Sequence, residues 1–278
     1  MSYWIELIMS REKTATKDFP FKRLAELLKC SRKFCIVGYE FSWESHLPHF
    51  NDILKGVWSE TSTKPPFNPF TSASDYRMVM NWFEWRRQTI VVSAIQFEPI
   101  QVLLRMQKAD PKFKIATQCV DGVMNMNGFD NAYELYGNVF QAICHDNGHE
   151  FATWPGFGTN DQRISCEICG SIVLPNVEMF GWNKKSAVRM KVMDLFEKSG
   201  VLILIGVDKN LAPFSEMNDG RLTQLPIIEI QRDCITLRDR DVAYVTSINS
   251  IENNVGEKLS SPRDWSLTRT MRYLSLIH

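Results

Sequence analysis

The feature that most constrains the fold is a series of short apolar segments separated by segments with helical spacing. Val201–Gly206 reads Val-Leu-Ile-Leu-Ile-Gly and is the most apolar, and Phe34–Gly38, Lys114–Thr117 and Pro226–Ile230 belong to the same series. Runs that are apolar on both faces are typical of strands buried inside a parallel sheet. Helical patterns occupy the ranges Phe21–Cys30, Tyr76–Arg87, Pro99–Lys108 and Lys184–Ser199. The alternation predicts an α/β fold in which helices cover both faces of a doubly wound parallel sheet.

Charge and composition exclude several classes of protein. The 278-residue chain has 32 basic and 32 acidic residues, so no overall field attracts nucleic acid or an acidic membrane. No apolar run reaches the about 18 residues of a membrane span, and Met1–Ser10 does not resemble a signal peptide. The seven cysteines are scattered and odd in number, which fits a reducing compartment. We therefore expect a cytoplasmic protein with no nucleic-acid or membrane partner.

The section from about Tyr136 to Phe180 differs in character from the rest of the chain. Gly and Pro interrupt it repeatedly, as in Trp154–Gly158. It also carries residues that are able to bind a metal, namely Cys144, Cys166, Cys169, and His145 or His149. We expect a small metal-stapled module inserted into the larger domain.

Several motifs resemble those of the sirtuin family in order and spacing. The match covers about Lys33 to Gln231. Its motifs are Thr117-Gln118-Cys119-Val120-Asp121-Gly122-Val123, Glu134-Leu135-Tyr136-Gly137, Cys166-x-x-Cys169-Gly170, Pro175-Asn176-Val177, Phe180-Gly181, Leu204-Ile205-Gly206 and Ala212-Pro213. Each motif alone is weak, whereas the ordered set is specific.

The resemblance implies an architecture and a ligand site. It implies a Rossmann-like large domain formed by residues 1–135 and 183–259, a small zinc-ribbon-like module at 136–182, and a C-terminal tail at 260–278. It also implies NAD and an acylated peptide in the cleft between the two parts. The positions that match the family's NAD contacts are Gly38, Ser42, Gln118, Asp121 and Gly206. Among them, Asp121 stands at the family's nicotinamide-pocket position.

The phosphate-binding positions depart from the family's pattern. Sirtuins begin this site with Gly-Ala-Gly-Ile-Ser, whereas this chain reads Gly38-Tyr39-Glu40-Phe41-Ser42. A carboxylate repels a diphosphate, and a larger residue resists close approach of the main chain. The family's arginine is replaced by Asn51, and Asp208 adds a second acid where the family has Ser. The loop is therefore either a turn without a ligand or a pocket reshaped for another molecule.

The catalytic positions depart as well. Cys119 replaces the family's ribose-side Asn, and Tyr136 replaces the His that acts as general base. Tyrosine has an ordinary pKa of about 10, against about 6.5 for histidine, so it is a poor proton acceptor at neutral pH. We expect deacylation to be slowed by roughly 10²–10⁴. Tyr136 either fills space or acts as an unusual acid–base residue, so we assign no residue a catalytic role.

The zinc ligands that the resemblance implies are two Cys-x-x-Cys pairs, of which only the second is intact. In the first pair Cys144 is present and its partner aligns with Asn147. The expected set is therefore Cys144, His149, Cys166 and Cys169, with His145 as the other choice for the fourth ligand. Loss of the metal is the alternative.

Aromatic residues near the first loop and in the tail leave two interpretations open. Tyr39 and Trp43 either form an exposed patch for a partner or belong to the core. The tail, with Arg269 and Tyr273, either docks a partner or packs on its own domain.

These departures favour a sirtuin-fold pseudo-enzyme that is incompetent as a deacylase, binds NAD weakly if at all, and acts through protein–protein interaction. The alternative is a divergent NAD-consuming sirtuin, acting as NAD hydrolase, ADP-ribosyltransferase or deacylase. Binding of a different small molecule in the cleft is a third hypothesis.

Overall fold

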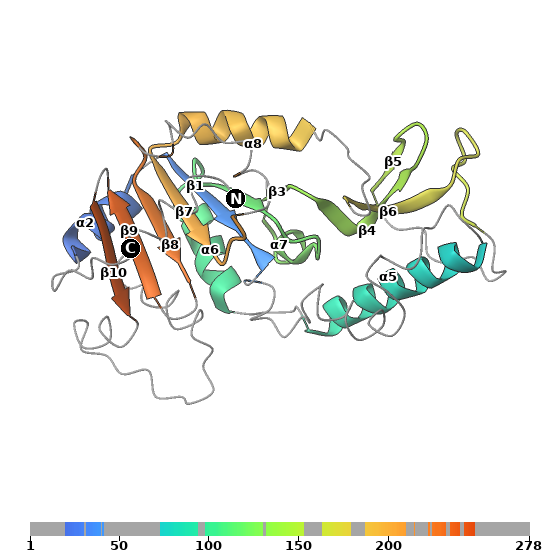
Figure 1. Cartoon of the computed structure of the whole chain (residues 1–278), viewed down its shortest axis with the longest axis horizontal. Coiled ribbons are helices and arrows are strands. Elements are labelled where there is room, and N and C mark those ends of the chain that lie inside the picture. The colour runs from blue at the N-terminus through green and yellow to red at the C-terminus, as the bar shows by residue number, and fades with distance from the viewer. Residues whose placement is uncertain are drawn as a thin grey trace.

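The computed structural model describes most of the central part of the chain (Figure 1). The described residues are 20–30, 32–39, 41, 73–93, 98–129, 132–152, 163–178, 187–209, 214, 222, 224–231, 234–239 and 242–247. Glu40, Ser42, Trp43, Asn51 and the tail 260–278 lie outside them, so the expectations for these positions stay predictions.

A seven-stranded sheet forms the larger part of the molecule. In spatial order its strands are β10 (Val242–Ser247), β9 (Cys234–Asp239), β8 (Ile227–Ile230), β7 (Val201–Ile205), β1 (Lys33–Val37), β2 (Lys114–Thr117) and β3 (Ala132–Glu134). The pairs from β8 to β3 are parallel, whereas β8–β9 and β9–β10 are antiparallel. The sheet is thus mostly parallel, as the apolar segments predict, with an antiparallel edge that they do not.

Helices cover both faces of this sheet, which confirms the predicted fold class. Along β1, Cys35 and Val37 face one hydrophobic cluster, and Phe34 and Ile36 face another. Side chains of α2 (Phe21–Leu28), α5 (Ala73–Ser93) and α6 (Glu98–Ala109) complete the first cluster, and α8 (Ala187–Lys198) completes the second. Since successive strand residues point to opposite faces, a strand covered on both sides must be apolar throughout.

A smaller three-stranded antiparallel sheet forms a module beside the large sheet (Figure 1). Its order is β5 (Glu150–Phe151), β4 (Gly137–Cys144) and β6 (Val173–Val177). Helix α5 runs along this module. The Tyr76 hydroxyl donates to the carbonyl of Val173 at 3.0 Å, and Arg87 donates to the carbonyl of Val139 at 2.8 Å. The module is therefore held by a helix that precedes it in the sequence.

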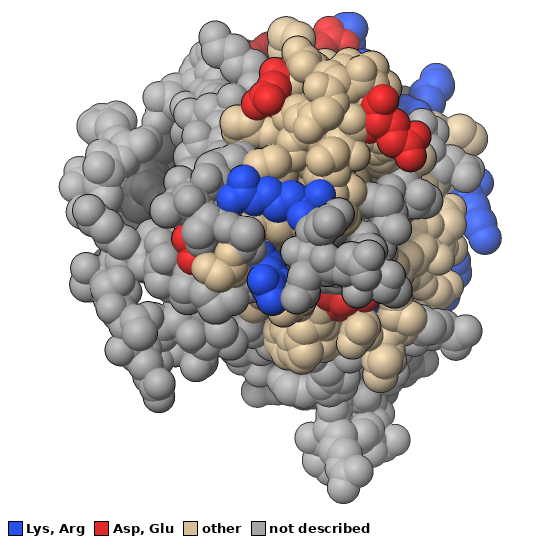
Figure 2. Space-filling model, turned by 90° about the vertical axis from the view of Figure 1, so that its right-hand side faces the viewer, with Lys and Arg blue, Asp and Glu red and all other residues tan. Residues whose placement is uncertain are grey.

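Within the described residues no helix is both long and apolar enough to cross a bilayer. On the face in Figure 2, the described acidic and basic side chains are interspersed.

Candidate functional site

The carboxyl ends of the two central strands lie in close contact. The main-chain N–H of Gly38, directly after β1, donates to the carbonyl of Ile205 at 2.8 Å. A Cβ on Gly38 would lie 2.0 Å from the carbonyl oxygen of Gly206, so no larger residue fits without a shift of the main chain. The strand order changes direction between β1 and β7, and open α/β sheets bind ligands at such a point. The sequence-predicted residues Gly38 and Gly206 thus meet at the expected crevice.

Gln118 links two loops across this crevice. Its side-chain Nε2 donates to the carbonyl of Asp208 at 2.9 Å, and its Oε1 accepts from the N–H of Asp208 at 3.0 Å. Both hydrogen bonds are made to the main chain of Asp208, three residues after the end of β7. Main-chain N–H groups at such ends are the usual phosphate ligands of this class of sheet. Here the N–H of Asp208 already donates to the side-chain amide of Gln118.

Cys119 closes the other side of the crevice. Its buried Sγ donates to the carbonyl of Gly38 at 3.2 Å, and its N–H donates to the Thr117 hydroxyl at 3.0 Å. The thiol therefore ties the end of β2 to the end of β1, at the position where the resemblance expects a ribose-contacting Asn.

Asp121 lies beside a buried arginine that sequence reasoning missed. Asp121 is 4% exposed, and its Oδ1 accepts from the N–H of Val123 at 3.0 Å at the start of α7 (Val123–Met126). Arg86 of α5 is 5% exposed. Burial lowers the pKa of Arg86, and the neighbouring Asp121 and Cys119 act in the opposite direction. Nothing in the local sequence, Glu84-Trp85-Arg86-Arg87-Gln88, distinguishes Arg86 from an exposed helical arginine.

Glu134, the last residue of β3, is a second carboxyl group near Asp121. Its Oε1 accepts from the side-chain amides of Asn138 at 2.7 Å and Asn125 at 3.0 Å. Burial raises the pKa of Glu134 to about 7, with the charge of Asp121 adding to this effect and both amides opposing it. Glu134 is therefore partly protonated at neutral pH, unlike an ordinary glutamate.

Tyr136, at the position where the resemblance expects a general base, is covered by a cation. The Arg189 guanidinium of α8 lies over its ring, with Cζ 5.1 Å from the ring centroid. Arg189 also forms an ion pair with Glu178, the residue directly after β6. The N–H of Glu178 donates to the carbonyl of Tyr136 at 2.8 Å. This arrangement joins α8 to the smaller module.

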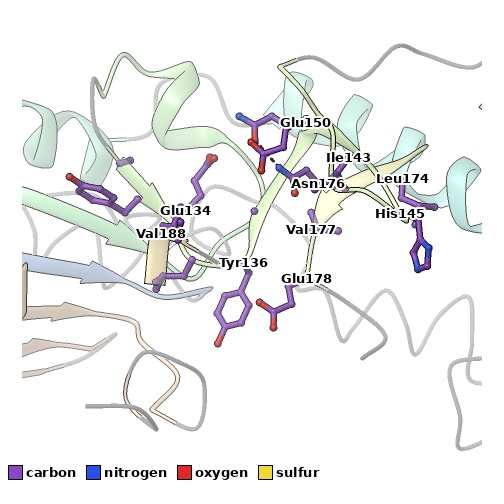
Figure 3. Close-up of a pocket in the computed structure, with 17 residues that line it drawn as sticks. Glu134, Tyr136, Ile143, His145, Glu150, Leu174, Asn176, Val177, Glu178 and Val188 are labelled. Atoms are coloured by element: carbon purple, nitrogen blue, oxygen red, sulfur yellow. Dashed lines mark hydrogen bonds between the residues drawn. The ribbon is translucent and has the colours of Figure 1, made fainter. Parts of the chain in front are cut away.

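Tyr136 and Glu178 also line a cavity of about 680 Å³ between the module and α8 (Figure 3). Its wall includes one face of β4 and β6, with Ile143 and Leu174, and the start of α8. Two further carboxyl groups, Glu134 and Glu150, lie along the wall. In Figure 3, Tyr136 and Glu178 project side by side.

The four predicted metal ligands converge in the module. The ligand atoms of Cys144, His149, Cys166 and Cys169 all lie within 4.8 Å of one another. His149 Nδ1 is 3.5 Å from Cys144 Sγ and 3.4 Å from Cys166 Sγ, and Cys144 Sγ is 3.5 Å from Cys169 Sγ. Tetrahedral zinc, with bonds of about 2.3 Å to sulfur and about 2.0 Å to nitrogen, separates its ligand atoms by roughly 3.5–3.8 Å. Three thiols and an imidazole at these separations fit zinc.

Two glycine turns bring these ligands together. Gly148 (φ +66°) donates its N–H to the carbonyl of Cys144 at 3.0 Å, and Gly170 (φ +75°) donates to that of Cys166 at 2.7 Å. Glycine suits such left-handed positions. His145, the other choice for the fourth ligand, instead pairs with Asp146 at 2.8 Å.

The cluster also favours a charged thiolate. Burial raises the pKa of Cys144, but hydrogen bonds with the main chain of His149 and Asn147 and with the other two thiols outweigh it and bring the pKa to about 6. Because the thiolate is the metal-binding form, this shift favours binding of a cation.

The sequence and the structure are similar to proteins of one family. The profile described as the Sir2 family matches residues 38–213. An NAD-dependent protein deacylase of Aquifex aeolicus is 27% identical over 66% of this chain and 75% of its own length. One of Aeropyrum pernix is 29% identical over 68% and 76%.

Solved structures give the same result. The fold is similar to that of a Sir2 homologue in complex with NAD, with a TM-score of 0.64 and 23% identity over 79% of this chain and 84% of that one. A point-mutated Sir2 homologue with ADP-ribose gives a TM-score of 0.63 and 23% identity, over 76% and 84%. Since the family profile alone covers more than half of the sequence, this chain belongs to the Sir2, or sirtuin, family.

Proposed function

We propose that this Sir2-family protein does not remove acyl groups from lysine and instead binds a partner protein through its cleft. The observation that carries the proposal is Tyr136, which stands at the base position with the Arg189 guanidinium over its ring. A phenol with an ordinary pKa of about 10 does not accept a proton readily at neutral pH. An adjacent cation favours the phenolate, but it also occupies the space over the ring.

The crevice supports the same proposal. A diphosphate needs main-chain N–H donors and few acids nearby. Here the N–H of Asp208 is bonded to Gln118, and the thiol of Cys119 replaces an amide. The N–H groups of Gly38 and Asp208 donate to Ile205 and Gln118 of the protein itself. The residues present therefore fit a dinucleotide poorly.

A second candidate function is cleavage of NAD without deacylation. The relatives cited above are named as NAD-dependent, and the similar structures hold NAD or ADP-ribose. The observation that favours it is the carboxyl pair Asp121 and Glu134, since carboxylates stabilise developing positive charge.

One set of assays tests both candidates. The purified chain is incubated with NAD and an acetylated lysine peptide, and deacetylated peptide and free nicotinamide are measured separately. We expect neither product, and no thermal stabilisation by millimolar NAD; a ligand at 100 times its dissociation constant would add about 2.7 kcal/mol. Deacetylation within about tenfold of an active relative assayed in parallel would refute the proposal. Nicotinamide release without deacetylation would establish the second candidate.

A single replacement serves as the matched control. We expect Tyr136→His not to restore deacylation, because Cys119 and the Gln118–Asp208 bonds remain. Rescue by this change alone would mean that the cofactor crevice is functional.

We further propose that Cys144, His149, Cys166 and Cys169 hold one zinc ion. A closed set of four protein ligands leaves no position for substrate, so the ion stabilises the module and takes no part in chemistry.

A further inference from the structure

Tyr136 and Glu178 together have the composition of a receptor for a cation. An aromatic ring attracts a guanidinium or ammonium placed over its face, and a carboxylate beside it adds a charge-assisted hydrogen bond. The hydrogen bond from the N–H of Glu178 to the carbonyl of Tyr136 fixes the two residues next to each other. Arg189 of the same chain occupies both contacts.

The position of Arg189 in its helix disfavours its positive charge. It is in the first turn of α8, which begins at Ala187, and that turn contains no acidic residue. The N-terminal end of a helix carries partial positive charge, which disfavours a cation there. The side chains of Arg189 and Glu178 are each 17% exposed, so one edge of the ion pair is open to solvent. These two properties suit a contact that can be exchanged.

The surroundings of the pair are suited to a basic ligand. The adjoining cavity of about 680 Å³ is lined by the carboxyl groups of Glu134, Glu150 and Glu178. Among the lining residues that the structure describes, His145 is the only one whose side chain is able to carry positive charge, and it pairs with Asp146. A cavity of this size has room for several side chains of a bound peptide segment. Because Glu178 is ion-paired with Arg189, the negative charge of the wall comes from Glu150 and from Glu134 when it is ionised, and this charge complements a cationic segment.

We propose that Tyr136 and Glu178 bind an arginine or unmodified lysine side chain of a partner protein, and that Arg189 is an internal stand-in which this side chain displaces. The inference rests on the protein-binding function proposed above and adds the chemistry of the partner: a basic segment whose cationic side chain enters beside α8.

Removal of the stand-in tests this directly. The probe is a short capped peptide with one central arginine among alanines, and its control is the same peptide with citrulline, the neutral isostere of arginine. Binding is measured by calorimetry or by changes in the NMR spectrum. We expect Arg189→Ala to bind the arginine peptide at least about tenfold more tightly than the unmodified protein, and the citrulline peptide not to bind. Adding Glu178→Gln to Arg189→Ala should abolish the gain.

Two further variants keep the test decisive. Lys198→Ala removes a cation at the other end of α8, in an exposed pair with Asp194, and should leave binding unchanged. Arg189→Lys keeps the charge but loses the planar fork, so it should give a smaller gain, and it replaces Arg189→Ala if that variant does not fold. Equal binding of both peptides, or no gain in a folded Arg189 variant, would overturn the inference. The deacylation and NAD assays decide the proposed function independently, because they do not use these peptides.

Discussion

The charge of Glu134 gives a quantitative test of the cleft's electrostatics through the pH dependence of stability. Its pKa is about 7, against an ordinary value of 4.5. In the Glu134→Gln variant the side-chain carbonyl still accepts from Asn138 and Asn125. The shape is preserved as well, so the variant removes the titration and little else.

The sign follows from proton binding. Between pH 4.5 and about 7 the folded state holds the proton of Glu134 and the unfolded chain does not. The free energy of unfolding therefore falls as the pH rises through this range. The contribution is complete below the unfolded pKa and is lost above the folded one. At about 1.4 kcal/mol per unit, the shift corresponds to about 3 kcal/mol.

The assay is urea unfolding of the unmodified protein and Glu134→Gln at about pH 5 and about pH 8, so that other titrating groups cancel in the difference. We expect the variant to gain about 2–3 kcal/mol relative to the unmodified protein between the two conditions. For a chain of this size that equals roughly 4–12 °C in Tm. A difference that changes by less than about 0.5 kcal/mol would refute the reasoning, because it would mean that water reaches the carboxyl group.

Three further predictions concern the metal cluster and the packing of the sheet. Protein purified without chelator should contain one zinc per chain by elemental analysis, and a folded protein without zinc would contradict the assignment. His149→Ala should weaken the retention of zinc against a chelator, whereas His145→Ala should not. Gly38→Ala should lower the free energy of unfolding in urea by on the order of 3 kcal/mol, because its Cβ would lie 2.0 Å from the carbonyl oxygen of Gly206. An unchanged free energy of unfolding would disprove this contact. Asp110→Asn should lower the free energy of unfolding by about 2 kcal/mol or more, because the side chain of Lys33 is only 3% exposed and ion-pairs with Asp110 at 2.8 Å. A loss below about 0.5 kcal/mol would show that water reaches the ammonium group of Lys33.

Local sequence was sufficient for elements buried on both faces. The structure has β1, β2, β7 and β8 at or within one residue of the apolar segments that predicted them. The antiparallel strands β9 and β10 were not predicted, because they are mixed in composition and their pairing depends on neighbours. Helix α5 begins at Ala73 and ends at Ser93, beyond the Tyr76–Arg87 pattern. The spacing of apolar residues in α5 does not predict the contacts of this helix with the smaller module.

The metal cluster likewise has a part that the sequence predicted and a part that depends on the folded structure. Cysteine and histidine are few and chemically distinctive, so the sequence, together with the family resemblance, predicted Cys144, Cys166, Cys169 and His149, with His145 as the other choice for the fourth position. Only the turn from Cys144 to Gly148, closed by the hydrogen bond between them, places His149 in the cluster.

What the sequence by itself determined was the class of sheet and the order of the family's motifs. What only the tertiary structure decided was which charges meet: Arg86 with Asp121, and Arg189 with Tyr136 and Glu178. The physical reason is that burial on both faces leaves an apolar pattern within one segment. A charged contact instead depends on the distance between side chains from separate segments, and that distance is fixed only when the sheet and the module pack together.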